Sequence, residues 1–336
     1  MIEAAHPRSP WRDAMSAKRR RQSGHPPSRA GSCPRYGRTG GAVTPTSSTA
    51  NTRPARLLHA GDVTRAASLA RVDLMPRTDE GRAGWAALRE APERALVALD
   101  YDGVLAPIVT EPSQAWPAPD ALDVLRMLAG RVGRLAVVTG RPAADVVALG
   151  GLDSVPGLVV EGQYGAEHWE AGELTTPDEP PAVTAARSLL PGALQGADPG
   201  VWVEDKRLAL VVHSRKAAAP DEELARLAPA IRAVAARTGL EVHPGKMVLE
   251  LRPPGFDKGG VLRRLVAGAS PGAVLFAGDD VGDIPAFAVV AELRAEGIPG
   301  LSVASASDET APEVLAAADL AVDGPPGVVE LLRSLV

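Results

Sequence analysis

Short unbroken apolar runs alternate with helix-length segments along the chain from about residue 80 onward. The first run, at residues 95–99, ends at Asp100, and such runs are typical of strands buried on both faces of a parallel sheet. Similar runs predict strands at residues 135–138, 158–160, 273–276, 301–303 and 320–322. The spacing predicts helices at residues 80–90, 119–128, 143–149 and 258–266, with a short one at the C-terminus. This alternation predicts an α/β fold with a doubly wound parallel-sheet core.

The segment at residues 177–246 interrupts this rhythm. Its pattern predicts helices at 182–190 and 222–237 and strands at 201–204, 208–213 and 240–243. Only residues 205–207 join the first two of these strands, and a connection this short suits antiparallel pairing. We therefore expect an inserted α+β cap domain between two core segments, at residues 81–176 and 247–336. In the second core segment, residues 247–251 are expected to form a core strand.

Residues 1–80 differ from the rest of the chain. They are rich in Arg, Pro, Ser, Gly and Thr and show no sustained apolar period, which predicts a disordered, basic N-terminal tail. A translation start near Met75 is an alternative to such a tail. The segment lacks the apolar core of a secretory signal, so we expect a cytoplasmic protein.

Composition narrows the classes of partner. The chain has 336 residues, 45% of them hydrophobic and 23% charged, with a formal net charge of −5. The single cysteine, Cys33, excludes an internal disulfide framework and suits a reducing compartment. No run approaches the ~20 apolar residues that span a bilayer, so no membrane partner is expected. Aromatic residues make up only 3%, which argues against a nucleic-acid partner. The oligomeric state stays open, with a monomer as the default.

Two carboxylates follow the first predicted strand. Asp100 and Asp102 are two positions apart, so both side chains would leave the sheet on the same side, at the edge where open α/β sheets bind ligands. Carboxylates in one crevice repel each other unless a cation lies between them or one keeps its proton. The pair suits a divalent-metal site, a nucleophile or an acid/base pair, and the alternative is an ordinary strand end followed by a turn at Gly103.

Three further candidate sites, two single residues and one group of carboxylates, fall at strand ends or helix starts. Thr139 follows one strand, Lys258 opens a helix, and the carboxylates of Asp279, Asp280 and Asp283 follow another strand. Taken singly, Thr139 suits a helix cap and Lys258 a solvated surface lysine. Three carboxylates within one turn favour a cation. Together the set suits the handling of a phosphoryl group, in which a carboxylate can act as the nucleophile.

Four motifs, in chain order, resemble those of the haloacid dehalogenase-like phosphatases. They are DYDGVLAPIV, VVTGRP, the lysine of FDKGG, and AGDDVGDIPAF. Within that superfamily, EGQYGAE, EDKRLALVVHSR and HPGKMVLELRPPGFDKGG resemble segments of the trehalose-6-phosphate phosphatases, which carry a C2-type cap. The resemblance extends from about Ala95 to Val336 and does not reach the tail.

The resemblance implies a role for each matching residue. Asp100 would be the nucleophile, and Asp102 would protonate the leaving oxygen and then activate water. Thr139 and Lys258 would bind the phosphoryl group. The implied ligands of Mg²⁺ are Asp100, Asp102 (through its carbonyl) and Asp279, with Asp280 and Asp283 contributing further. The implied substrate-binding residues are Arg141, Glu204, Lys206, Arg215 and Glu250.

The leading hypothesis is therefore Mg²⁺-dependent hydrolysis of trehalose 6-phosphate, a small-molecule substrate, through an aspartyl-phosphate intermediate. One alternative is a phosphatase of the same fold that acts on sucrose 6-phosphate or mannosyl-3-phosphoglycerate. Another is a non-catalytic subunit of a trehalose-synthesising complex. The chain departs from the family at Tyr164, where the family usually has a histidine, so the role of that position stays open.

Overall fold

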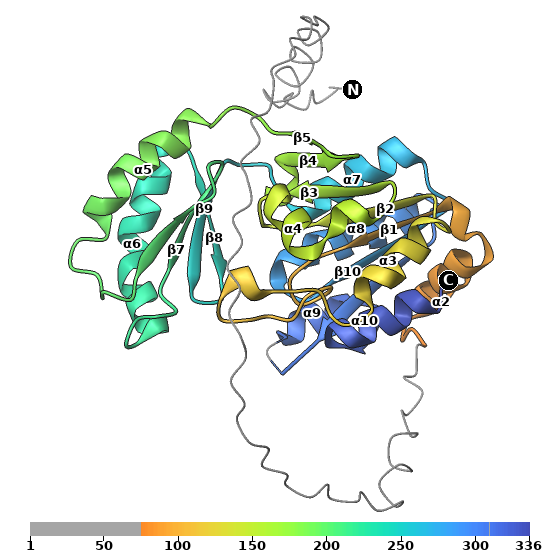
Figure 1. The fold of residues 1–336 in the computed structure, drawn as a ribbon. Coiled ribbons are helices and arrows are strands. Elements are labelled where there is room, and N and C mark those ends of the chain that lie inside the picture. Colours follow the sequence, from red (N-terminus) through yellow and green to blue (C-terminus); the bar gives the residue numbers. More distant parts are fainter. Residues whose placement is uncertain (1–74, 309) are drawn as a thin grey trace, which may run out of the picture. The chain divides into compact units, whose positions relative to one another are not determined.

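The computed structural model describes residues 75–308 and 310–336, which form two β-sheets with helices packed on them (Figure 1). The larger sheet has eight strands in the order β12-β11-β10-β1-β2-β3-β4-β5. Its strands are β1 (Ala95–Leu99), β2 (Arg134–Val138), β3 (Leu158–Gly162), β4 (Glu167–Glu170), β5 (Glu173–Thr175), β10 (Ala273–Gly278), β11 (Gly300–Ala306) and β12 (Leu320–Asp323). The strands from β12 to β3 in this order are parallel, while β4 and β5 are antiparallel additions at one edge.

Helices cover both faces of the large sheet because its central strands are apolar on both faces. In β1, Val97 and Leu99 belong to one hydrophobic core, and Leu96 and Ala98 belong to a second. The first core is closed by α2 (Asp79–Glu90), α3 (Ala121–Ala129), α4 (Ala143–Gly150) and α10 (Gly324–Arg333). The second is closed by α7 (Lys258–Ala269), α8 (Ile284–Ala295) and α9 (Pro312–Ala317). The predicted α/β class with a doubly wound parallel core is confirmed.

Three details of the core differ from the sequence prediction. Strand β3 continues through Gly162, two residues beyond the predicted end at residue 160, and a tight turn at Gln163–Gly165 follows it. Strands β4 and β5 were not predicted, because they are short and rich in charged residues. Helix α3 begins at Ala121 rather than at residue 119, since Asp120 before it has a left-handed backbone with φ of 65°. Short 3₁₀ turns lie at Pro92–Arg94, Pro112–Gln114, Leu152–Ser154 and Val281–Asp283.

The smaller sheet is antiparallel and carries two helices on one face. Its strands are β6 (Trp202–Asp205), β7 (Leu210–His213), β8 (Glu241–Gly245) and β9 (Val248–Arg252), in the order β6-β7-β9-β8. Helices α5 (Pro181–Ala193) and α6 (Pro220–Thr238) form a separate hydrophobic core with the inward-facing residues of β7 and β9. The antiparallel pairing of β6 with β7 agrees with the short connection between them.

One strand lies in a different sheet from the one that we predicted. The segment expected to resume the core at residues 247–251 does form a strand, β9, but it pairs with β7 and β8 in the smaller sheet. A cap that ended at residue 246 would separate β9 from its partners, so the boundary belongs after Arg252. The second core segment then resumes at α7.

The first described residues are tied to the core. The backbone N–H of Arg77 donates to the carbonyl oxygen of Asp319 over 2.8 Å, and the Thr78 hydroxyl donates to its carboxylate over 2.6 Å. Thr78 also caps α2 by accepting from Gly81 N–H. The boundary predicted at residue 80 is therefore too late, and the rest of the predicted tail lies outside the described residues. No helix among residues 75–308 and 310–336 is long and apolar enough to cross a membrane.

Candidate active site

The residues that follow three central strands meet at one edge of the large sheet. Strand β1 lies between β10 and β2, and its last residue, Leu99, is level with Ala277 in β10 and Val137 in β2. Asp100, Asp279 and Thr139 come directly or almost directly after these strands. Because parallel strands end at a common edge, residues separated by up to 179 positions in the chain become neighbours there.

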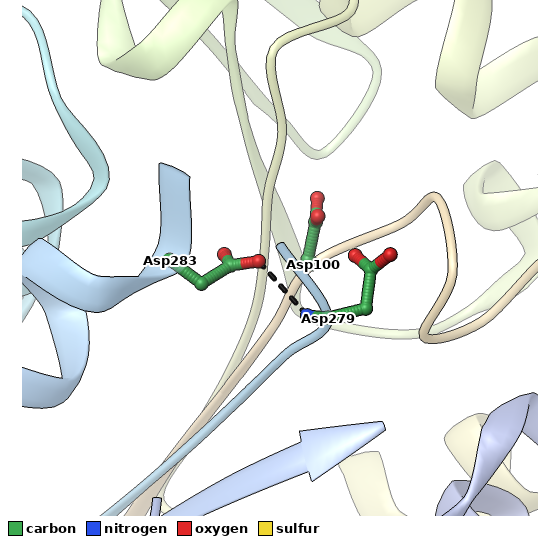
Figure 2. A group of neighbouring side chains, drawn as sticks. All are labelled: Asp100, Asp279 and Asp283. Atoms are coloured by element: carbon green, nitrogen blue, oxygen red, sulfur yellow. Dashed lines mark hydrogen bonds between the residues drawn. The ribbon is translucent and has the colours of Figure 1, made fainter. Parts of the chain in front are cut away.

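Three carboxylates form a compact group at this edge. Asp100, Asp279 and Asp283 each offer an oxygen, and these oxygens all lie within 4.8 Å of one another (Figure 2). The ammonium of Lys258 is inserted among them, with Nζ 2.7 Å from Oδ2 of Asp100 and 2.7 Å from Oδ1 of Asp283. Lys258 is only 4% exposed, which excludes the solvated-lysine alternative.

Burial and charge crowding shape the ionisation of this group. Burial raises the pKa of Asp279 to about 9, and the carboxylates of Asp100 and Asp283 act in the same direction. Burial also raises the pKa of Asp283 to about 6 and that of Asp100 well above its usual range, although Lys258 opposes both shifts. Burial alone would lower the pKa of Lys258, but Asp100 and Asp283 hold it well above its usual value.

The donor set fits a hard divalent cation. When all are ionised, the three carboxylates carry two more negative charges than Lys258 compensates, in a site that water reaches poorly. Carboxylate and carbonyl oxygens are the ligands that Mg²⁺ and Ca²⁺ take. A dication here would balance the charge and favour the ionised carboxylates.

The loop after β10 is held by its own carboxylates. Oδ2 of Asp283 accepts from the backbone N–H groups of Asp279 over 2.9 Å and Asp280 over 3.2 Å. Oδ1 of Asp280 accepts from Gly282 N–H over 2.8 Å and caps the short turn. Asp280 is exposed and does not belong to the three-carboxylate group, so its direct contact in the structure is with the loop.

Asp102 lies to one side of that group and pairs with Arg141. The guanidinium makes two bonds to this carboxylate, from Nε over 2.6 Å and from the second terminal nitrogen over 2.7 Å. Its other terminal nitrogen donates to the Pro112 carbonyl over 2.8 Å. Thr139 is 1% exposed, and its hydroxyl oxygen accepts from the backbone N–H of Arg141 over 3.2 Å. The phosphoryl-binding candidates Thr139 and Arg141 thus share one turn beside Asp102.

Two of the predicted cap residues reach the core. Lys206 Nζ donates to the Gly140 carbonyl over 3.1 Å and lies 3.4 Å from Oε1 of Glu250. The Tyr164 hydroxyl, which belongs to the core, donates to Oε2 of Glu250 over 3.2 Å. The side chains of Lys206 and Glu250 are only 13% and 9% exposed, so both are largely shielded from solvent.

The other two predicted cap residues have different surroundings. Nε2 of His213 lies 2.9 Å from Oε2 of Glu204, and this hydrogen bond lowers the pKa of Glu204. The charges of Lys206 and Arg141 act on Glu204 in the same direction. Arg215 is partly buried and forms no hydrogen bond or ion pair with any residue in the described part of the chain. Its predicted role in binding sugar stays a prediction.

Two residues near the site were not found from the sequence. The Ser305 hydroxyl, 1% exposed on β11, donates over 2.5 Å to the carbonyl of Gly103 in the turn after Asp102. Arg252 lies over the Tyr164 ring, with its guanidinium carbon 3.7 Å from the ring centroid. Arg252 is two residues after Glu250 in a strand, a spacing that could have placed both on one face. Nothing in the sequence marks Ser305.

Comparison with known proteins connects this geometry to one family. The family profile described as Trehalose-phosphatase matches residues 98–320. The trehalose-phosphate phosphatase of Mycobacterium tuberculosis is 38% identical over 210 residues, which cover 58% of this chain and 51% of that protein. The chain thus spans about half the length of the curated relatives it matches.

Solved structures agree on the fold. The structure of Aspergillus fumigatus trehalose-6-phosphate phosphatase has a TM-score of 0.54 at 26% identity and covers 78% of this chain and 98% of its own. The C-terminal domain of trehalose-6-phosphate phosphatase from C. albicans has a TM-score of 0.62 at 22% identity, with the same coverage, and supports the fold alone. Because the family profile spans both core segments and the cap, this chain belongs to the trehalose-phosphatase family.

Proposed function

We propose that this chain hydrolyses trehalose 6-phosphate to trehalose and inorganic phosphate, with Mg²⁺ as its cofactor, as a step of trehalose biosynthesis. The observation that carries the proposal is the buried group of Asp100, Asp279, Asp283 and Lys258 at the carboxyl edge of a family-typical fold. Membership of the trehalose-phosphatase family supports the substrate class.

Asp100 would act as the nucleophile. A carboxylate oxygen of Asp100 would bond to phosphorus while the bond from phosphorus to the sugar oxygen breaks, which gives an aspartyl-phosphate. Lys258 supports this role, because its ammonium contacts Asp100 and could neutralise charge on the transferred group. Thr139 and Arg141, in the adjacent turn, would bind the phosphoryl oxygens with a hydroxyl and a guanidinium.

Asp102 would move the protons. It would give a proton to the leaving sugar oxygen and then take one from the water that attacks phosphorus, which releases phosphate and restores Asp100. Both oxygens of Asp102 are bonded to Arg141 here, so at least one of these bonds must be exchanged when substrate binds. The phosphoryl group would thus compete with Asp102 for Arg141.

Mg²⁺ would be held by the carboxylates of Asp100 and Asp279 and the backbone carbonyl of Asp102, with Asp280 and Asp283 supporting the loop. When bound, Mg²⁺ supplies neutralisation of charge on the phosphoryl oxygens. Asp283 has a second task in this proposal, because it fixes the loop after β10 and also shares Lys258 with Asp100.

The cap would recognise the sugar. Glu250 and Lys206 lie at the junction with the core. Val211 in β7 pairs with Glu204 on one side and with Glu250 on the other, so both carboxylates lie on the same face of the small sheet. Charged groups shielded from water make strong hydrogen bonds to hydroxyls, which are all that a disaccharide offers. Arg215 is the fourth candidate. We further propose a cytoplasmic monomer without nucleic-acid or membrane partners.

Phosphate release from a panel of substrates tests this function. The panel is trehalose 6-phosphate, sucrose 6-phosphate, mannosyl-3-phosphoglycerate, glucose 6-phosphate and p-nitrophenyl phosphate, each with Mg²⁺ and with EDTA. We expect a strong preference for trehalose 6-phosphate that EDTA abolishes. Even activity across the panel would remove the trehalose assignment and keep a phosphatase. Inactivity on every substrate would favour the non-catalytic subunit.

A further inference from the structure

Three consecutive residues after β3 adopt left-handed backbone conformations. Their φ angles are 46° at Gln163, 57° at Tyr164 and 83° at Gly165. Left-handed conformations are unfavourable for residues other than glycine, and where they persist the surroundings hold them in place. Here two backbone bonds do so: Gln163 N–H donates to the Arg141 carbonyl over 2.8 Å, and Tyr164 N–H donates to the Thr139 carbonyl over 3.0 Å.

This conformation puts the Tyr164 side chain over the turn that carries Thr139 and Arg141. A Cβ atom at Gly140 would lie 2.7 Å from the Tyr164 hydroxyl oxygen, so the ring occupies the space that only a glycine leaves free. The ring is therefore in direct contact with the turn proposed to bind the phosphoryl group.

The same side chain also contacts the cap. The Arg252 guanidinium stacks on it at 3.7 Å from the centroid, and the hydroxyl donates to Oε2 of Glu250 over 3.2 Å. Lys206 holds the other oxygen of Glu250 at 3.4 Å and bonds to the Gly140 carbonyl. Burial and the neighbouring Glu250 raise the pKa of Tyr164 above its usual value, so its hydroxyl keeps the donated proton.

We propose that Tyr164 is a positioning residue for substrate selection, because its hydroxyl fixes the Glu250 carboxylate and its ring joins that carboxylate to the phosphoryl-binding turn. This inference rests on the proposed function and deepens it. In the proposed function, the Glu250 carboxylate binds the sugar and the turn at residues 139–141 binds the phosphoryl group. The Tyr164 side chain contacts both and so fixes the distance between them. A purely structural tyrosine would need only its ring.

The variant Tyr164→Phe separates these roles, because it removes the hydroxyl and keeps the ring on Gly140 and Arg252. We expect the KM for trehalose 6-phosphate to rise about 10-fold, the scale of one hydrogen bond to a charged group, with kcat changed less than about 2-fold. The KM for p-nitrophenyl phosphate, which has no sugar, should not change. The matched control is Thr238→Val, which removes a hydroxyl that bonds only within α6 and should leave both KM values unchanged.

A double-mutant cycle identifies the partner. Glu250→Gln alone should raise the KM for trehalose 6-phosphate, and adding Tyr164→Phe to it should raise that KM by less than about 2-fold more, because the shared contact is already lost. Thermal unfolding of each variant verifies that it folds. Glu250→Gln alters the hydrogen bond between Tyr164 and Glu250 from the cap side.

Unchanged KM values in Tyr164→Phe, an equal effect on both substrates, or full additivity with Glu250→Gln would overturn the positioning role. A wild-type protein that hydrolyses p-nitrophenyl phosphate but not trehalose 6-phosphate would instead overturn the proposed function on which this role rests. The two failures are therefore distinguishable.

Discussion

The substitution Asp279→Asn is expected to stabilise the metal-free protein while it removes the proposed activity. Asp279 shares a buried site with Asp100 and Asp283, and Lys258 is the only cation in contact with this group among the described residues. Removing one carboxylate relieves repulsion that Mg²⁺ would otherwise compensate. Active sites commonly hold such unfavourable arrangements at a cost in stability.

The magnitude follows from the ionisation of Asp279. Its pKa is about 9 in the folded protein, against an ordinary value of 3.8, so at pH 7 folding requires it to take up a proton. Because the pKa of Asp279 is higher in the folded state than in the unfolded state, this residue destabilises the folded protein at pH values above the unfolded pKa. The destabilisation disappears below that pKa. Each pH unit between 3.8 and 7 adds about 1.4 kcal/mol to this destabilisation. The stability that Asp279→Asn can recover at pH 7 therefore has an upper bound of about 4 kcal/mol. Partial exposure reduces the gain to about 2 kcal/mol, or about 4–8 °C in Tm for a domain of this size.

The assay is thermal unfolding at pH 7 with EDTA, repeated with Mg²⁺. The wild-type Tm should rise on addition of Mg²⁺, and the Asp279→Asn protein should start higher and respond less. The matched control is Asp280→Ala, in the same loop, which should lose about 0.5–2 kcal/mol because it removes the side-chain oxygen that caps a turn. If Asp279→Asn lowers the Tm in EDTA as much as Asp280→Ala does, the reasoning from crowded charge is refuted.

Two further predictions concern buried polar residues that are not members of the three-carboxylate group. Ser305→Ala should lower kcat on trehalose 6-phosphate about 10-fold, because it removes the hydroxyl that bonds to the Gly103 carbonyl beside Asp102. The matched control is Ser188→Ala, which removes a hydroxyl bonded within α5 and should leave kcat unchanged; an unchanged kcat in Ser305→Ala would contradict the prediction. Burial would raise the pKa of Asp319, but bonds from Arg294, Ser302 and Thr78 outweigh it and lower that pKa. This stabilisation is present above about pH 4 and is lost as the pH falls through the folded pKa, so urea unfolding of Asp319→Asn should show a loss of about 1–3 kcal/mol at pH 7 that shrinks at pH 3. A loss independent of pH would rule out the ionised form as the source.

The central sheet and the residues at its edge were predictable because they follow from local patterns. Unbroken apolar runs marked the parallel strands, and carboxylates directly after them had to meet at one edge. The rule brought together Asp100 and Asp279, which are 179 positions apart. No contact had to be known in advance.

The prediction that β9 belongs to the core sheet was wrong, because it relied on the presence of a strand without considering which of its faces are apolar. In the sequence Val248–Arg252, Glu250 and Arg252 alternate with Leu249 and Leu251, which is the pattern of a strand with one open face. A parallel core strand would be apolar on both faces. The alternation was visible, and it would have placed β9 in the antiparallel cap sheet.

The contacts of Tyr164 and Ser305 could not have been predicted. Tyr164 reaches Glu250 across 86 positions, and only the left-handed backbone at residues 163–165 directs it there. Sequence propensity disfavours that conformation at Gln163 and Tyr164. Ser305 lies within an apolar strand, and its role depends on how close β11 comes to the turn at Gly103.

The most direct test of the account is the rate of phosphate release from saturating trehalose 6-phosphate with Mg²⁺, in the wild-type protein and in Asp100→Asn. This change keeps the shape of the side chain and removes the nucleophilic oxygen. We expect the rate to fall at least about 1000-fold, as for loss of other nucleophiles, while Asp280→Asn stays within about 10-fold of wild type. An Asp100→Asn protein that retains a tenth or more of the wild-type rate would contradict the central claim.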